Sequence, residues 1–474
     1  MAVIGREKEI RTLKQCYESE RSEFVVVYGR RRVGKTFLIK ELFETEFTFY
    51  STGILGGDRL TQLQTWNREI ARYGGNGIPD AKNWIEAFEN LNTLTERASE
   101  RKKKVIFLDE ISWMSTTRSD FLTGLDYYWN RWASSRKDIL LIVCGSAASW
   151  VTDNIVNSRG GLHNRLTRRI LIQPFCLNEC KQYYESRRIP LTPHQMAEAY
   201  MIFGGIPYYM SLMEPHLSLY QNVDNIYFAQ GSELRNEFSN LYRSLFNDAE
   251  RYVNIIETLA KKGIGMARGE IAEELNISNG GRLTKTLQDL SESGFIRKYK
   301  AYGHKKKESL YQLIDFFSLF DIRFRSGRES FSSDYWLRFS TTSAYSIWSG
   351  ISYEKLCLLH LSQIRKKLGI SGVLTAAFSW RGKFEDKGAQ IDLVIDRNDN
   401  VINLCEIKFA SQSYTLDKSD SDALREKRAA FIGATHTRKA VVTTMITTFG
   451  LTRNMYSSEI YHEVTLNDLF EPND

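Results

Sequence analysis

The chain has 474 residues, which is too long for a single hydrophobic core, so we expect about three or four domains. With 42% hydrophobic and 26% charged residues, its composition is typical of soluble globular proteins. No apolar stretch approaches the roughly 20 residues of a membrane span, and the first residues lack a basic-then-apolar leader. The six cysteines show no CxxC spacing. These features predict a cytoplasmic protein without disulfides, a zinc site or a membrane partner.

The net charge of +7 is concentrated in short basic runs. The main runs are 30–32, 101–104 and 305–307. Such runs favour a polyanionic partner, which we take to be nucleic acid, with DNA preferred over RNA. Solvated loops would explain any single run equally well.

Residues 29–36 fit the pattern G-x-x-x-x-G-K-[ST] at every fixed position. An apolar, β-branched run at 23–28 precedes them, and residues 37–43 continue at helical spacing, as a phosphate-binding loop requires. We expect ATP here: Lys35 would reach the β- and γ-phosphates, and the hydroxyl of Thr36 would bind Mg²⁺. The expected nucleotide-binding residues are Gly29, Arg30, Arg31, Arg32, Val33, Gly34, Lys35, Thr36 and Phe37.

Two further apolar runs end in polar residues. The run 105–108 is followed by Asp109, which is expected in the Mg²⁺ shell, and by Glu110, which would polarise the attacking water. The run 139–144 leads to Ser146, whose side chain would contact the γ-phosphate or the water. Ligands bind at the carboxyl ends of parallel strands. Helical stretches alternate with these strands, so we predict an α/β fold, a P-loop NTPase domain of three layers. The stretches are 59–73, 84–98 and 119–134.

These motifs resemble the AAA+-related archaeal and bacterial ATPases of the STAND group. The likeness rests on Ile4-Gly5-Arg6-Glu7, the P-loop, Leu108-Asp109-Glu110, Cys144-Gly145-Ser146 and Gly204-Gly205-Ile206-Pro207, and it covers about residues 1–320. It implies that Gly5 and Arg6 lie by the adenine, that Ser146 is a sensor, and that Pro207 of a helical lid touches the base. A first-turn helix position would explain Pro207 equally well.

An arginine between the ATPase core and the lid would stabilise charge on the transferring phosphoryl group. Arg165 is the first choice. No spacing rule separates it from Arg159, Arg168 or Arg169.

Residues 246–320 have the pattern of a winged helix-turn-helix. Three helical stretches are followed by a strand, a basic turn at 305–307 and a second strand. Arg282, Lys285 and the three lysines of the turn would contact DNA phosphates. A role as a packing module remains open.

The C-terminal region combines a helix with three strands. The helix is predicted at 351–368, with Glu354 near its apolar stripe, and the strands at 373–381, 390–396 and 401–409. Alternation places Glu406 and Lys408 on one face, and an adjacent antiparallel strand carries Asp392. Two carboxylates and an amine in this arrangement can bind a hard cation and orient a water, as phosphodiester hydrolysis requires.

This pattern resembles the PD-(D/E)XK nuclease superfamily over about residues 325–474, an α/β fold like that of restriction endonucleases. The resemblance implies Asp392, Glu406 and Lys408 as catalytic residues. It also implies Glu354, Asp392 and Glu406 as ligands of Mg²⁺ or Mn²⁺. Ile391-Asp392 stands where the superfamily has Pro-Asp. A simple salt bridge between Glu406 and Lys408 is the alternative explanation.

The sequence thus predicts four domains: an AAA+-like ATPase core at 1–175, a helical lid at 176–245, a winged helix at 246–320 and a nuclease-like domain at 325–474. The leading hypothesis is an Mg²⁺-dependent ATPase that controls a DNA-cutting nuclease in defence against foreign DNA. It would act as a homo-oligomer or through ATP-dependent assembly. The alternatives are an ATP-switched DNA-binding regulator that does not cut and an RNA-cleaving effector.

Overall fold

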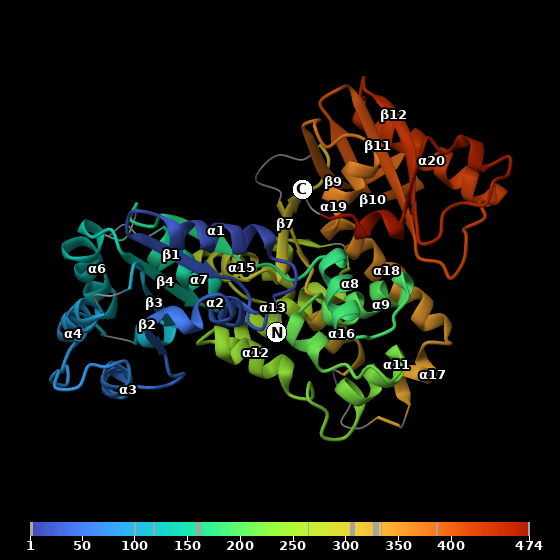
Figure 1. The fold of residues 1–474 in the computed structure, drawn as a ribbon. Helices are drawn as coiled ribbons and strands as arrows, with labels where there is room; N and C mark the ends of the chain where they lie inside the picture. The colour runs from blue at the N-terminus through green and yellow to red at the C-terminus, as the bar shows by residue number, and fades with distance from the viewer. Residues whose placement is uncertain are drawn as a thin grey trace. The chain divides into compact units, whose positions relative to one another are not determined.

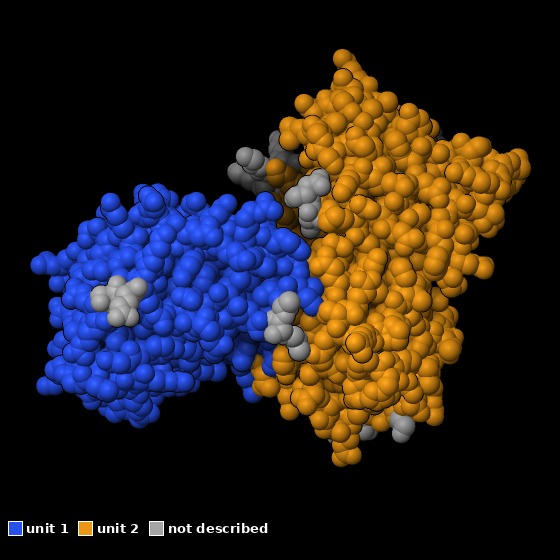
Figure 2. Space-filling model, in the orientation of Figure 1, with its two compact units in different colours: residues 1–174, 241–249, 288–294 blue, residues 175–240, 250–287, 295–474 orange. Residues whose placement is uncertain are grey.

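The computed structural model describes residues 3–98, 101–116, 119–157, 162, 164–263, 265–303, 309–325, 331–332, 334–384 and 387–472. The chain forms two compact units: residues 1–174, 241–249 and 288–294 make the first, and the remaining residues make the second (Figure 2). In the described part of the chain, no helix is long and apolar enough to cross a membrane. The finer division into four domains stays a prediction.

A parallel sheet of five strands organises the first unit (Figure 1). Its strands are β1 (Glu23–Tyr28), β2 (Phe47–Thr52), β3 (Lys104–Asp109), β4 (Ile139–Gly145) and β5 (Arg168–Leu171), in the order β2-β3-β4-β1-β5. Because β4 lies between β3 and β1, the loop after β1 and the carboxylates after β3 lie on either side of the end of β4. The predicted parallel α/β architecture is confirmed.

Helices cover this sheet because alternate strand residues on both faces are apolar. Phe24, Ile106 and Leu141 pack with Trp66 and Trp84 in one core, while the alternating residues on the opposite face are also fully buried. The helices are α1 (Glu7–Glu18), α2 (Lys35–Phe43), α3 (Arg59–Arg72), α4 (Trp84–Arg97), α5 (Ile111–Met114), α6 (Phe121–Arg131) and α7 (Ala148–Val151).

Strands β2 and β5 were not predicted. β5 contains one buried residue, Ile170, flanked by exposed neighbours, so its apolar signal is too weak for a strand prediction. Its place in the sheet comes from pairing with β1, which no local pattern encodes.

The middle of the chain is mostly helical and includes a small antiparallel sheet. Its helices are α8 (Leu177–Ser186), α9 (Pro193–Phe203), α10 (Pro207–Ser211), α11 (Leu219–Val223), α12 (Glu237–Leu245), α13 (Ala249–Lys261), α14 (Arg268–Glu274), α15 (Gly281–Glu292), α16 (Phe316–Phe324) and α17 (Tyr335–Phe339). The sheet has the order β6-β8-β7, with β6 (Met266–Ala267), β7 (Ile296–Lys300) and β8 (Ser309–Leu313).

A second five-stranded sheet ends the chain, in orange to red in Figure 1. Its order is β13-β12-β11-β10-β9, formed by β9 (Thr375–Phe384), β10 (Lys387–Arg397), β11 (Val401–Lys408), β12 (Ala440–Thr447) and β13 (His462–Thr465). β9, β10 and β11 are antiparallel as expected, whereas β11, β12 and β13 run parallel.

Helix α20 (Lys418–Thr435) packs on one face of this sheet. Its residues Ala430 and Phe431 share a core with Ile391, Val394 and Leu404 of the strands. The even-numbered residues of β11, such as Leu404 and Glu406, therefore point toward α20.

The single helix expected at 351–368 is wrong, because the structure has α18 (Ser343–Leu359) and α19 (Leu361–Lys367) with a break at His360. The buried His360 ring explains the break. Its Nδ1 lies 2.8 Å from the carbonyl oxygen of Leu356, and its Nε2 accepts the N–H of Leu177 at 3.1 Å. The ring is therefore neutral, with its proton on Nδ1, and burial lowers its pKa to about 4.

The small sheet is joined to the edge of the terminal sheet. Ala301, next after β7, forms a parallel bridge with Ser379 of β9, and the N–H of Tyr302 donates to the Ser379 carbonyl at 2.9 Å. The Tyr302 ring then packs on Phe378 and Phe431. The two sheets of the second unit are thus connected through backbone and core.

Candidate nucleotide site and carboxylate site

The P-loop wraps around the buried ammonium of Lys35. Nζ of Lys35 donates to the carbonyl oxygens of Gly29 at 2.9 Å and Arg30 at 2.8 Å. Gly34 precedes α2 with φ 93°, and a Cβ on Gly29 would lie 2.3 Å from the Ile172 carbonyl oxygen, so both positions need glycine. The N-terminus of α2 supplies the free N–H groups and positive dipole end that phosphates prefer.

Thr36 and Asp109 meet at the edge of the sheet, where β3 ends. The Thr36 hydroxyl donates to Oδ2 of Asp109 at 2.8 Å, and Oδ1 of Asp109 accepts the N–H of Glu110 at 3.0 Å. A hydroxyl beside a carboxylate is a donor set of hard oxygens that suits Mg²⁺. Burial, together with the charge of Asp109, raises the pKa of the neighbouring Cys144 thiol well above its usual value, so this cysteine is neutral.

Glu110 is restrained by Ser146. The Ser146 N–H donates to Oε2 of Glu110 at 3.1 Å, and its hydroxyl donates to Oε1. Glu110 itself has φ 50°, an uncommon conformation for a residue with a side chain, which turns the chain sharply after Asp109. The structure thus brings Lys35, Thr36, Asp109, Glu110 and Ser146 together, with Ser146 bound to the glutamate.

Gly5 and Arg6 directly precede α1, and the Arg6 side chain binds protein atoms that include a P-loop carbonyl. Both have left-handed backbone conformations, and the buried Arg6 guanidinium donates to the Gln173 carbonyl at 2.6 Å and to the Val33 carbonyl at 3.5 Å. Arg6 therefore connects the start of the chain to the P-loop and to the segment after β5. Its expected place beside the adenine stays a prediction.

The remaining predicted nucleotide contacts are less defined. Arg165 is exposed in the turn before β5, and Arg168 and Arg169 are exposed on β5. Arg159 lies outside the described residues. Pro207 is the first residue of α10, a position that favours proline for structural reasons alone.

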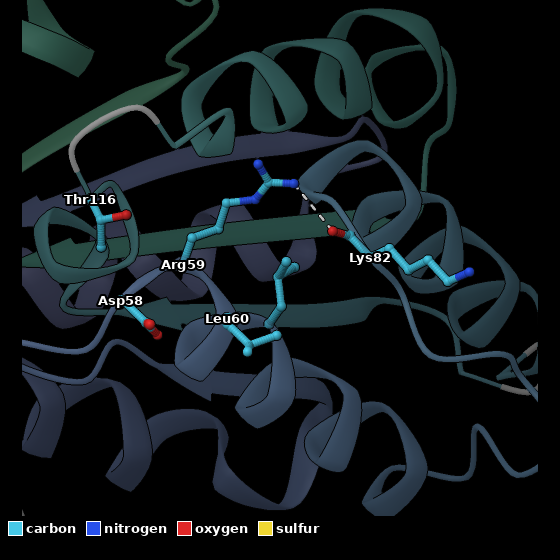
Figure 3. Close-up of a pocket in the computed structure, with 6 residues that line it drawn as sticks. Asp58, Arg59, Leu60, Lys82 and Thr116 are labelled. Carbon is cyan, nitrogen blue, oxygen red and sulfur yellow. Dashed lines mark hydrogen bonds between the residues drawn. The ribbon is translucent and has the colours of Figure 1, made fainter.

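A separate open cavity of about 670 Å³ lies where α3 begins (Figure 3). Its lining residues are Asp58, Arg59, Leu60, Leu63, Lys82 and Thr116. Figure 3 shows Arg59 reaching across it, where a guanidinium nitrogen donates to the Lys82 carbonyl at 3.2 Å. No P-loop residue lines this cavity, so it is distinct from the phosphate site.

Glu406 and Lys408 lie on the α20 face of the terminal sheet, and Asp392 lies on the adjacent strand β10. Leu393 pairs with Cys405 across β10 and β11, and Asp392 and Glu406 are the next residues along the two strands. Nζ of Lys408 lies 3.1 Å from Oε1 of Glu406, so the predicted shared face is confirmed. Burial acts to lower the pKa of Lys408, but the charge and hydrogen bond of Glu406 outweigh it and the pKa is raised.

Glu354 faces the same group of charges from α18. Burial is the main cause that raises its pKa to about 8, and the charges of Asp392 and Glu406 add to it. The adjacent Lys355 is buried and donates to the Gly263 carbonyl at 2.9 Å; burial lowers its pKa to about 8. A cation bound nearby would therefore favour the ionised form of the Glu354 carboxyl group.

Two residues of this site were missed from the sequence. Nζ of Lys427 on α20 lies 2.6 Å from Oε2 of Glu406, and Nε2 of Gln390 donates to Oδ1 of Asp392 at 2.6 Å. A signal for Lys427 did exist. Lys427 falls between Leu424 and Phe431 on the apolar stripe of its helix, where a lysine without a partner would be costly.

The fit of a divalent cation to this site depends on Glu406. Among the described residues, no three His, Cys, Asp or Glu side chains form a group that could hold a metal as they stand. The donors Asp392 and Glu406 are nevertheless neighbouring carboxylates, which suit Mg²⁺ or Mn²⁺. To bind the cation, Glu406 would have to lose its contact with one of the two lysines, Lys408 or Lys427.

Residues 4–213 match the model of an ATPase domain found predominantly in Archaea. An uncharacterized protein of Methanocaldococcus jannaschii is 25% identical over 411 residues, 86% of this chain and 87% of that protein. An uncharacterized ATP-binding protein of the same organism is 37% identical over 43 residues, 9% of this chain and 73% of that protein. The solved Walker-type ATPase of Pyrococcus abyssi has a TM-score of 0.48 and 17% identity, covering 68% of this chain and 96% of that one.

The matched span contains the P-loop lysine, the Thr36–Asp109 pair and the Glu110–Ser146 pair. This is the set of groups needed to bind ATP with Mg²⁺ and to activate water. Residues 4–213 are thus similar to this family of predominantly archaeal ATPases, and this similarity supports a P-loop domain that binds and hydrolyses ATP.

Proposed function

We propose that the ATPase domain controls a metal-dependent nuclease formed by the C-terminal region, which cuts DNA in defence against foreign DNA. The observation that carries the proposal is the grouping of Asp392, Glu406 and Lys408 on two adjacent strands, with Glu354 close by. A protein that only binds DNA has no need of a paired carboxylate site next to a lysine.

Each residue has a distinct part in this proposal. Asp392 and Glu406 would hold the cation, which when bound polarises the scissile phosphate and activates water at neutral pH. Lys408 would orient that water or stabilise negative charge on the phosphate. Gln390 keeps the Asp392 carboxylate in place, because Arg381 in turn donates to Oε1 of Gln390 at 2.9 Å and 3.1 Å.

We favour DNA as the substrate because a group of helices followed by a hairpin, which we take to be a winged helix, is joined to the terminal sheet. Helices α13, α14 and α15 precede the β7–β8 hairpin, and Arg282 and Lys285 are exposed on α15. The lysines at 305–307 lie outside the described residues. The Ala301–Ser379 bridge connects the hairpin to the sheet that carries Asp392, so DNA bound by the wing would be held close to the cutting site.

Two other functions fit parts of the same site. A regulator would bind DNA under the control of ATP without cutting, and an RNA-cleaving effector would use the same carboxylates on another substrate. The ATPase would act in either case through a homo-oligomer or an ATP-dependent assembly.

The test is to incubate the full chain with plasmid, linear DNA and RNA, with and without ATP, in Mg²⁺ or Mn²⁺. We expect cleavage of DNA that Asp392→Asn removes. The matched control is Asp396→Asn. It removes another carboxylate of the same strand, one that lies 2.6 Å from Nζ of Lys439. Cleavage that survives in both Asp392→Asn and Glu406→Gln would leave the binding regulator as the better account.

A further inference from the structure

Glu406 is neutralised by two lysines from different elements. Lys408 of β11 lies 3.1 Å from Oε1, and Lys427 of α20 lies 2.6 Å from Oε2. The Glu406 side chain is 15% exposed, so neither contact is the loosely hydrated pair common on protein surfaces. Both oxygens of the one carboxylate that β11 offers to a cation are therefore already engaged by ammonium groups.

The position of Lys427 on its helix shows that this contact is specific. Three residues earlier, Leu424 lines a cavity of about 10 Å³ together with Glu406, and four residues later Phe431 enters the core. Lys427 thus projects from the side of α20 that faces the sheet. Glu406 is the carboxylate that Lys427 contacts from this side.

The two lysines differ in what holds them near Glu406. Lys408 is two residues away on the same strand, so the backbone fixes its distance. Lys427 is on a separate helix, and its side chain, 30% exposed, can turn toward solvent without moving α20. A divalent cation and an ammonium on the same oxygen would repel each other strongly, so Lys427 is the group that would have to leave.

We propose that Lys427 is a built-in counter-ion of Glu406 that a divalent cation must displace, so that it sets how much cation is needed to load the site. This inference rests on the proposed nuclease function. Without the cation, Lys427 and Lys408 together stabilise the partly buried Glu406 carboxylate. With the cation, Lys427 is released toward solvent, beside a site that would receive a phosphate.

The test is a titration of the nucleotide-free full chain with Mn²⁺, with free Mn²⁺ measured by electron paramagnetic resonance. Glu406→Gln defines which part of the binding belongs to this site. We expect Lys427→Met to bind Mn²⁺ roughly tenfold more tightly than the parent, because the ammonium that competes for Glu406 is removed. Lys427→Arg should stay close to the parent.

Lys418→Met is the matched control, because it removes a lysine from the exposed start of the same helix. Its Mn²⁺ affinity should equal that of the parent, which excludes a general effect of net charge. Circular dichroism and ATP hydrolysis report whether each variant is folded. DNA cleavage by Lys427→Met should also reach half its maximum at a lower Mn²⁺ concentration.

The outcomes separate this inference from the proposed function. Glu406-dependent Mn²⁺ binding that is unchanged or weaker in Lys427→Met would overturn the role of Lys427 and leave the nuclease site standing. An absence of any Glu406-dependent Mn²⁺ binding in the parent and in Lys427→Met would overturn both.

Discussion

We expect nucleotide binding to depend on Lys35 more than on any other P-loop side chain. Its ammonium is held in the centre of the P-loop by the carbonyls of Gly29 and Arg30. We predict that Lys35→Ala lowers ATP hydrolysis by about 100-fold or more and weakens nucleotide binding, because the variant lacks a positive charge aimed at the phosphates. Turnover assays and titration with a fluorescent ATP analogue will measure the two effects. Tight nucleotide binding in Lys35→Ala would contradict the assignment.

Glu110 should behave differently from Lys35. Its carboxylate accepts two hydrogen bonds from Ser146 and lies next to Asp109, and we expect it to act on water and not on the phosphates. We predict that Glu110→Gln still binds ATP but hydrolyses it about 100-fold more slowly, since an amide cannot polarise water as a carboxylate does. Single-turnover hydrolysis compared with equilibrium binding checks this. A wild-type rate would rule out Glu110 as the activating group.

At the level of elements, the break between α18 and α19 depends on a neutral histidine. Burial lowers the pKa of His360 from 6.5 to about 4, so the stability it contributes is fully present above pH 6.5 and is lost as the pH falls toward 4. We predict that the free energy of unfolding falls by about 2 kcal/mol between pH 7.5 and 5 for this reason alone. Urea denaturation of the parent and of His360→Gln at both pH values isolates the effect. Equal pH dependence in the two proteins would contradict it.

The hairpin of β7 and β8 gives a second prediction at this scale. If its connecting turn binds DNA, replacing Lys305, Lys306 and Lys307 with Ala should lower DNA affinity and flatten its salt dependence. The slope of log K against log salt should become shallower by about 0.9 for each phosphate that a lysine no longer neutralises. Fluorescence anisotropy with a labelled duplex at several salt concentrations measures this slope. An unchanged slope would favour a packing role for the hairpin.

Across the whole molecule, the sequence predicted those features that are encoded locally. The P-loop is a contiguous motif between a strand and a helix, and β1 was predicted with the bounds that the structure gives it. The β10–β11 hairpin was equally visible, since a short turn fixes its register. The ATPase prediction is confirmed by the family match.

The features that the sequence did not predict depend on contacts between distant segments. β5 is a strand because it pairs with β1, although its own residues are mostly exposed. The pairing of Ser146 with Glu110 joins two strand ends 36 residues apart. Lys427 reaches Glu406 only because α20 packs back on the sheet. The nuclease activity itself stays a prediction.

The bridge between Ala301 and Ser379 also bears on how the chain avoids self-association. β9 is an outer strand of the terminal sheet, and an outer strand with unpaired backbone groups can pair with the same strand of another molecule. Residues 301 and 302, together with the Tyr302 ring, cover part of that edge. A fragment beginning at residue 325 would therefore carry an uncovered β9, and we expect it to aggregate where a fragment beginning before β6 remains dispersed; light scattering of the two fragments measures the difference.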